Sequence, residues 1–364
     1  MSKLFSPLPL GRITLRNRIV MSPMTRSRAI GNVPNALMAA YYAQRADAGL
    51  IITEGTSPSP DGLGYARIPG LFTHAQALAW REVTDGVHAR GGRIFVQLMD
   101  TGRVGHALNL PEGAHVRGPS AVAAPGQMHT DQQQSQPHPV PVAMSEADIE
   151  VAIEGFVASS TLAVDEAGFD GVELHGANGY LIEQFLNTAS NHRTDRWGGS
   201  PENRARFAIE VARRVAAAIG ADRLGIRLSP YGANGGMVAD PETPAVYEIL
   251  SRAFSEIGLV YVHVVDHSAL GAPPVPQPIK DLIRRTFHGV VILAGGFDRA
   301  SAEAALDEGR GDLVAFGRPF LANPDLVVRL AQGTPLAAPD FATFYTPGPK
   351  GYTDYPTSDA HRAV

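Results

Sequence analysis

The sequence predicts an α/β protein whose eight parallel strands close into a (β/α)8 TIM barrel. Short apolar runs rich in Val, Ile and Leu recur along the chain, as is typical of strands buried on both faces. Amphipathic helical segments separate these runs, and no Gly-x-Gly-x-x-Gly follows any of them, which disfavours a doubly wound nucleotide-binding sheet. The predicted strands are 18–24, 50–54, 93–99, 171–175, 224–229, 259–265, 290–294 and 313–316.

Capping residues predict where several of the intervening helices begin. Ser145, followed three residues later by Asp148, predicts a helix that Gly168 terminates. Ser200 and Pro201 are a cap and a first helical residue for the segment through Ala218. We expect Asn323-Pro324 to begin the last helix in the same way.

Two segments fall outside the strand–helix repeat, although we expect one domain over residues 1–364. The connection at about 100–143 follows the third strand, and a loop of this length is usually functional or disordered. We interpret it as a lid over the mouth of the barrel. The tail at 332–364 is rich in Pro, Gly and Tyr, and we expect it to pack back on the barrel.

Composition excludes several classes of function. Net charge is −5 without long runs of either sign, so we expect no nucleic-acid or membrane partner. No cysteine is present, which excludes disulfides, thiolate nucleophiles and cysteine-bound metals. The first ten residues do not match a secretory signal, and no apolar stretch approaches the roughly 18 residues of a membrane span. We expect a cytoplasmic protein.

Polar side chains occur where the interior of a barrel strand should be apolar. Gln97 and His175 lie at carboxyl ends of strands, where barrel enzymes place their chemistry. Arg227 lies between aliphatic residues, and a buried charge needs a partner. That partner is either a ligand or a carboxylate such as Glu173 or Glu54. His263 is expected to be a hydrogen-bonded core histidine, and no metal site is predicted.

The seventh and eighth strands run into glycine-containing turns. Gly295-Gly296 follows one strand and Gly317-Arg318 follows the other. Glycines let backbone N–H groups approach an anion, and an arginine adds a charge-assisted hydrogen bond. These loops form the phosphate site of many barrels, so we predict one here.

The segment after the fourth strand brings three polar groups together at the mouth of the barrel. His175 and Asn178 can both donate hydrogen bonds to one oxygen, which stabilises an anion that develops there. Tyr180 can deliver a proton to a neighbouring atom.

Together these stretches resemble the old yellow enzyme family over about 4–356. The resemblance rests on motifs in the expected order. They are Ser22-Pro23-Met24-Thr25-Arg26, Glu54-Gly55-Thr56, Gln97-Leu98-Met99-Asp100-Thr101-Gly102-Arg103, His175-Gly176-Ala177-Asn178-Gly179-Tyr180, Asn191-His192-Arg193-Thr194-Asp195-Arg196-Trp197-Gly198-Gly199, Phe316-Gly317-Arg318 and Gly351-Tyr352-Thr353-Asp354-Tyr355-Pro356.

The resemblance implies bound, non-covalent FMN, with NADPH or NADH as electron donor and electrophilic alkenes as substrates in a ping-pong cycle. The implied substrates are α,β-unsaturated carbonyls, maleimides, nitroalkenes and nitrate esters. The implied FMN contacts are Pro23, Met24, Thr25, Gly55, Gln97 and Arg227, with Gly295, Gly296, Gly317 and Arg318 at the phosphate. His175 and Asn178 would hold the substrate oxygen, Tyr180 would protonate the α-carbon, and Tyr65, Met99 and Tyr345 would line the pocket. Members occur as monomers and as homodimers.

Three positions refine the resemblance. Thr25 stands where one subgroup of the family has cysteine, and the donor pair is His/Asn rather than His/His. Met99-Asp100 replaces the commoner Trp-His, which removes an aromatic ring near the pocket and adds a carboxylate at its rim.

Other barrel functions fit the sequence less well. An FMN barrel that oxidises 2-hydroxy acids or dihydropyrimidines shares the phosphate site but gives Tyr180 no role. A Schiff-base aldolase needs a lysine at a strand end, and Lys3, Lys280 and Lys350 lie elsewhere. A metal-dependent hydrolase needs clustered His and carboxylate ligands at strand ends, and only His175 and His263 are plausible ligands here. A non-catalytic flavin-binding protein leaves His175 and Tyr180 without a role.

Overall fold

All eight predicted apolar runs form strands of one closed parallel barrel in the computed structural model, which describes residues 2–358. The last strand pairs with the first, with Phe316 opposite Met21, and this pairing closes the barrel. The predicted TIM barrel is therefore confirmed. Its strands are β3 (Ile19–Met21), β4 (Leu50–Thr56), β5 (Ile94–Leu98), β10 (Gly171–Gly176), β11 (Leu224–Leu228), β12 (Tyr261–Val265), β13 (Val290–Ala294) and β14 (Leu313–Phe316).

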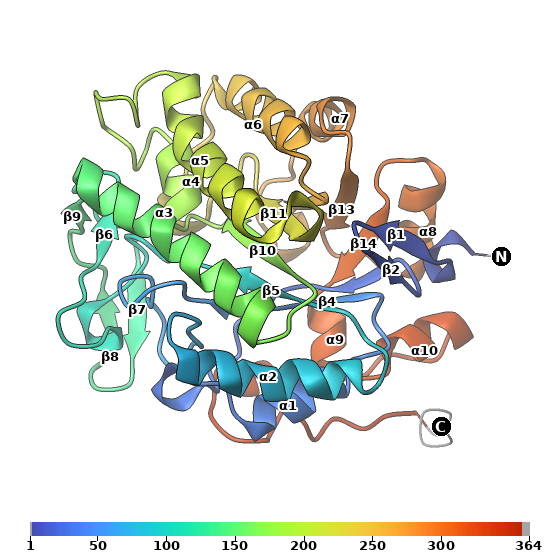
Figure 1. Ribbon diagram of the computed structural model, residues 1–364. Coiled ribbons are helices and arrows are strands. Elements are labelled where there is room, and N and C mark those ends of the chain that lie inside the picture. The colour runs from blue at the N-terminus through green and yellow to red at the C-terminus, as the bar shows by residue number, and fades with distance from the viewer. Residues whose placement is uncertain (1, 359–364) are drawn as a thin grey trace.

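Helices surround the barrel on its outside (Figure 1). The Ser145 hydroxyl accepts the Asp148 N–H in a capping box, and Ser200 accepts the Asn203 N–H with Pro201 in the first turn, as predicted. The helices are α1 (Ala36–Ala43), α2 (His74–His88), α3 (Glu146–Thr161), α4 (Leu181–Leu186), α5 (Pro201–Ile219), α6 (Thr243–Ile257), α7 (Gln277–Thr286), α8 (Arg299–Asp307), α9 (Arg318–Ala322) and α10 (Leu326–Gln332).

The predicted start of the last helix is wrong by two residues. α10 begins after Asp325, and Asn323 does not cap it. The Asn323 amide instead donates to the carbonyls of Pro319 and Ala337, so it joins α9 to the tail.

A hairpin that the sequence analysis did not predict lies at the amino end of the barrel. β1 (Leu8–Leu10) and β2 (Ile13–Leu15) pair antiparallel, and their leucines pack with Val20 and Leu50 in one buried cluster. Figure 1 shows this hairpin at one end of the barrel and the insertion after β5 at the other. The carboxyl ends of the strands are therefore the end that carries the insertion.

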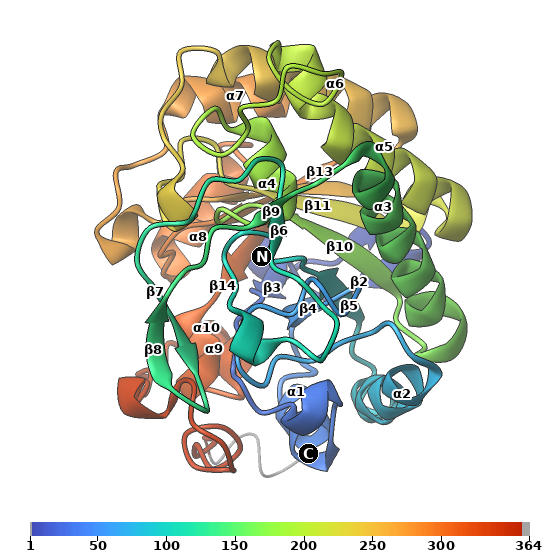
Figure 2. The same ribbon diagram turned by 90° about the vertical axis from the view of Figure 1, so that its left-hand side faces the viewer.

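The insertion contains two small sheets rather than an irregular loop. β6 (Arg117–Gly118) pairs with β9 (Val142–Ala143), and β7 (Gln127–Thr130) pairs with β8 (Gln134–Pro137). These strands face the viewer in Figure 2, in front of the barrel. Val104 and Met128 of the insertion pack with Tyr65 and Tyr180, two predicted site residues. Within residues 2–358, no helix is long and apolar enough to cross a membrane.

The tail packs back on the barrel as predicted, and buried arginines hold it there. Arg28 donates to the carbonyls of Thr343, Phe344, Gly348 and Lys350, and its guanidinium lies 4.5 Å from the centre of the Tyr352 ring. The Tyr352 ring in turn stacks on Tyr41 of α1, with 4.0 Å between ring centres.

Candidate functional site

A cavity of about 560 Å³ opens at the carboxyl ends of the strands. Its wall combines residues from the β3, β10, β11, β12, β13 and β14 ends with residues of the tail. Ten of the predicted site residues line it, and nine of them are Pro23, Met24, Thr25, Asn178, Arg227, Gly295, Gly296, Gly317 and Arg318. Tyr345, predicted to line the substrate pocket, is also in this wall and is 61% exposed.

One end of the cavity offers donors to an anion. The backbone N–H groups of Gly295, Gly296 and Gly317 make no hydrogen bond within the described part of the chain. Arg318 makes no ion pair there either, and its guanidinium lies 5.0 Å from the centre of the Phe341 ring. Unpaired N–H groups beside a free guanidinium are the donor set that binds a phosphate group.

Arg227 supplies a second cation deeper in the cavity. It is 6% exposed, and its buried Nε has no hydrogen-bond partner among the described residues. Burial lowers the pKa of Arg227, and the nearby Glu173 carboxylate opposes that shift. No ion pair joins Arg227 to Glu173 or Glu54, so Glu173 acts on this charge only from beyond ion-pair distance.

Glu173 and Glu54 form hydrogen bonds with residues other than the Arg227 side chain. Glu173 accepts from Gln97 Nε2 at 2.8 Å and contacts His263 Nδ1 at 2.9 Å. His263 is fully buried there, as the predicted core histidine. Glu54 accepts from the Arg26 N–H, and burial raises its pKa to about 7.

Glu183 of α4 holds the turn after β10 in place through hydrogen bonds. Glu183 accepts the Gly179 N–H at 2.6 Å and the Ser229 hydroxyl at 2.7 Å, and Ser229 in turn accepts the Asn178 N–H. Asn178 has a φ of 62° and Gly179 a φ of 79°. A side chain on Gly179 would meet the Asn234 carbonyl oxygen at 2.5 Å, so only glycine fits this turn.

His175 is neutral and presents one N–H. It is 3% exposed, and burial next to Arg227 lowers its pKa well below the usual value. The Ala177 N–H donates to His175 Nδ1 at 3.3 Å. A neutral imidazole that accepts at Nδ1 carries its proton at Nε2, so Nε2 is a donor.

Tyr180 lies against His175 and Tyr65. Its ring meets the His175 ring edge-on, with 4.8 Å between centres, and its hydroxyl lies 3.0 Å from the Tyr65 hydroxyl. Burial and the proximity of Tyr65 raise the pKa of Tyr180 well above its usual value. Tyr180 therefore keeps its phenolic proton.

Six predicted residues do not line the main cavity itself: His175, Tyr180, Tyr65, Met99, Gly55 and Gln97. They form a connected layer next to it, because His175 lies opposite Arg227 in register and Gln97 lies opposite Gly55. Met99 packs in a buried cluster beside Tyr65 and Tyr180. A Cβ on Gly55 would clash with Met99 Sδ, so glycine lets Met99 approach β4.

The expectation that Asp100 lies at the rim of this pocket is wrong. Asp100 is buried, accepts the Gly102 N–H at 2.8 Å, and faces a separate cavity with Asp61 and Arg117. Burial raises its pKa to about 6. The Asp100 side chain points away from the substrate pocket because its carboxylate accepts a backbone N–H of the following turn.

Several cavity residues were missed by the sequence analysis. Phe341 and Phe344 belong to the tail, of which only Tyr345 was predicted to reach this cavity. His267 was not among the predicted site residues, yet its Nε2 lies 2.7 Å from Asn178 Oδ1. The sequence feature that could have identified Phe341 and Phe344 is the presence of aromatic residues in a tail rich in Pro and Gly.

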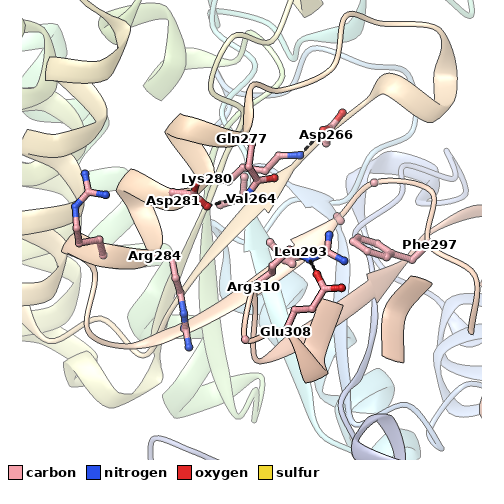
Figure 3. A pocket seen from close by; sticks show the side chains of 14 residues that line it. Val264, Asp266, Gln277, Lys280, Asp281, Arg284, Leu293, Phe297, Glu308 and Arg310 are labelled. Carbon is pink, nitrogen blue, oxygen red and sulfur yellow. Dashed lines mark hydrogen bonds and ion pairs between the residues drawn. The ribbon is translucent and has the colours of Figure 1, made fainter. Parts of the chain in front are cut away.

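A second cavity of about 320 Å³ lies beside the first and shares Asp266, Gly295 and Phe297 with it. Figure 3 shows Lys280 directed toward Asp266 and Arg310 directed toward Glu308. Lys280 pairs with Asp266 and Arg310 pairs with Glu308, each at 2.7 Å. Arg284, also in its wall, pairs with Asp312. No group of three or more His, Asp or Glu side chains in residues 2–358 could hold a metal ion.

Comparison with known proteins points to one family. A model of the NADH:flavin oxidoreductase / NADH oxidase family matches residues 3–337. The chain is 46% identical to chanoclavine-I aldehyde reductase fgaOx3 of Penicillium roqueforti, covering 98% of this chain and 96% of that protein. It is 41% identical to a probable flavin mononucleotide-dependent alkene reductase of Leishmania infantum, covering 97% of each. The solved structure of morphinone reductase superposes with a TM-score of 0.94 at 42% identity, covering 98% of this chain and 97% of that one. Some relatives at similar identity are described as probably inactive.

Proposed function

The chain belongs to the NADH:flavin oxidoreductase / NADH oxidase family, the old yellow enzymes, and on that premise we propose that it reduces activated C=C bonds with NADPH or NADH through bound FMN. The family and its named members support alkene reduction in general. The substrate classes proposed for this chain are α,β-unsaturated carbonyls, maleimides, nitroalkenes and nitrate esters.

The residues of the cavity fit FMN. Gly295, Gly296, Gly317 and Arg318 offer unpaired donors at one end, which suits the phosphate. Arg227 offers a buried Nε without a partner, which suits an electron-rich ring edge. Pro23, Met24, Thr25, Gly55 and Gln97 would hold the ring system between these two ends. Bound FMN would supply the hydride chemistry, with NADPH or NADH as the source and N5 of the flavin as the donor to the β-carbon of the alkene.

His175 and Asn178 would grip the carbonyl or nitro oxygen of the substrate. Charge builds on that oxygen as hydride reaches the β-carbon, so fixed donors act mainly in the transition state. His175 is suited to this role because it is neutral and carries its proton at Nε2. Tyr65, Met99 and Tyr345 would shape the pocket around the rest of the molecule.

Tyr180 would give its proton to the α-carbon, which completes the addition of one hydride and one proton across the double bond. The observation that carries this proposal is that the protonated Tyr180 is packed against the neutral donor His175. A non-catalytic flavin-binding protein has no use for such an arrangement.

Isotope labelling tests the proposal. The FMN-loaded protein would be supplied with 2-cyclohexenone, whose α- and β-carbons are distinct, and with NADPH carrying deuterium at the transferred C4 position. We expect one deuterium at the β-carbon, and in D₂O with unlabelled NADPH one deuterium at the α-carbon. Consumption of NADPH without any reduced alkene would contradict the proposal and favour an oxidase or an inactive member.

A further inference from the structure

Asn178 Oδ1 is contacted by two side chains from other loops. His267, which follows β12, places Nε2 at 2.7 Å, and Asn234, which follows β11, places Nδ2 at 3.4 Å. His267 and Asn178 both line the main cavity. The shorter contact is the stronger of the two, because hydrogen bonds weaken towards 3.5 Å.

These contacts decide which end of the amide the cavity meets. A carboxamide has an acceptor oxygen at one end and a donor NH₂ group at the other. With Oδ1 held by the His267 N–H, the Nδ2 hydrogens are the end left for a ligand. If the amide turned over, its oxygen would face the oxygen of a substrate, and two acceptors repel.

His267 must carry its proton at Nε2 to make this contact, since Asn178 Oδ1 only accepts. His175 also carries its proton at Nε2, in its case because its Nδ1 accepts the Ala177 N–H. Each member of the donor pair is therefore held in its donating form by a contact on its opposite side.

We propose that His267 is a positioning residue that fixes the Asn178 amide with its NH₂ group toward the substrate oxygen. This role rests on the proposed function, because it presupposes that Asn178 binds the oxygen of the substrate. His267 does not itself contact the reacting atoms.

A double-mutant cycle on the FMN-loaded protein tests the proposal, with para-chlorophenol as the probe. A phenolate oxygen takes the place of the substrate oxygen, and its stacking on the flavin is followed by absorption. We expect His267→Ala to weaken para-chlorophenol binding about fivefold, the scale of one hydrogen bond. In the Asn178→Ala background the same change should weaken binding less than about twofold, because the amide it acts on is absent.

Further variants separate orientation from packing. His267→Phe keeps a ring of similar size without an N–H and should match His267→Ala, whereas His267→Gln keeps a donor and should recover part of the affinity. His288→Ala removes an exposed histidine after α7 and should leave para-chlorophenol binding unchanged.

The possible failures are distinguishable. Equal losses in both backgrounds, or none in either, would overturn the role of His267 while leaving the proposed function intact. Unchanged affinity in Asn178→Ala would overturn the donor role of Asn178 and the positioning role with it. A wild-type protein that binds FMN but no phenol would overturn the donor pair of His175 and Asn178, and the positioning role with it, while the isotope test decides the proposed function separately.

Discussion

Replacing Tyr180 with phenylalanine removes a proton donor while keeping the ring that packs on His175. The structure limits what else is lost. The hydroxyl of Tyr180 contacts the Tyr65 hydroxyl at 3.0 Å, and a neutral hydrogen bond of this kind contributes about 0.5–1.5 kcal/mol, or about two- to tenfold. Loss of general acid catalysis costs about 100- to 10,000-fold. The two contributions therefore differ enough to be measured separately.

Stopped-flow absorption measures the two half-reactions in turn. We expect Tyr180→Phe to slow reoxidation by 2-cyclohexenone at least about 100-fold, and to change flavin reduction by NADPH less than about tenfold. Tyr65→Phe is the matched control, because it breaks the same hydroxyl pair but leaves the Tyr180 proton in place. It should slow reoxidation less than about tenfold.

Two results would refute this reasoning. Equal losses in both half-reactions for Tyr180→Phe would assign it a binding or structural role. Equal slowing of reoxidation by Tyr65→Phe and Tyr180→Phe would show that the hydroxyl pair matters and that neither hydroxyl is the proton donor.

Three further predictions concern the cofactor, the pH dependence and the tail. Arg318→Ala should weaken FMN binding about 10- to 100-fold in a fluorescence titration, as expected for a charge-assisted hydrogen bond, but leave riboflavin binding unchanged because riboflavin has no phosphate. Burial raises the pKa of Glu183 from 4.5 to about 7. Between these two pH values the native state binds more protons than the unfolded state. The free energy of unfolding therefore falls as pH rises through this range, by up to about 3 kcal/mol. Glu183→Gln should therefore reduce the drop in Tm between about pH 5 and about pH 8. Arg28→Met removes one donor from each of four tail carbonyls, and should lower the free energy of unfolding by about 2–4 kcal/mol and speed proteolysis in the tail.

Each of these has a contrary result. A matching loss of riboflavin affinity would place Arg318 away from the phosphate. The same slope of Tm with pH in Glu183→Gln would mean that this carboxyl does not titrate in that range. Unchanged unfolding and proteolysis in Arg28→Met would show that other contacts hold the tail, such as the Arg26 hydrogen bonds to the carbonyls of Phe344 and Gly351.

The barrel and much of the cavity wall were predictable because their signals are local. Apolar runs of strand length mark buried parallel strands, and glycines with Arg318 mark the loops after β13 and β14. The polar residues Gln97, His175 and Arg227 stood out because they interrupt such runs. Their placement at one end follows from the parallel topology of a barrel.

Other features depend on contacts between distant segments, which a single sequence does not show. Arg28 lies 315 or more residues from the tail carbonyls it binds, and nothing in its neighbourhood marks it as buried. The contact between His267 and Asn178 joins two loops 89 residues apart. Asp100 was placed at the pocket rim from its neighbour Met99, but successive side chains after a strand point in different directions.

The most direct test of the central claim is an absorption spectrum of the purified, FMN-reconstituted protein during titration with para-chlorophenol. A phenolate held by His175 and Asn178 over the flavin should add a broad long-wavelength charge-transfer band to the flavin peaks. That result would support the cofactor, the pocket and the donor pair together. Failure to retain FMN would contradict the account, and retained FMN without the band would contradict the donor pair.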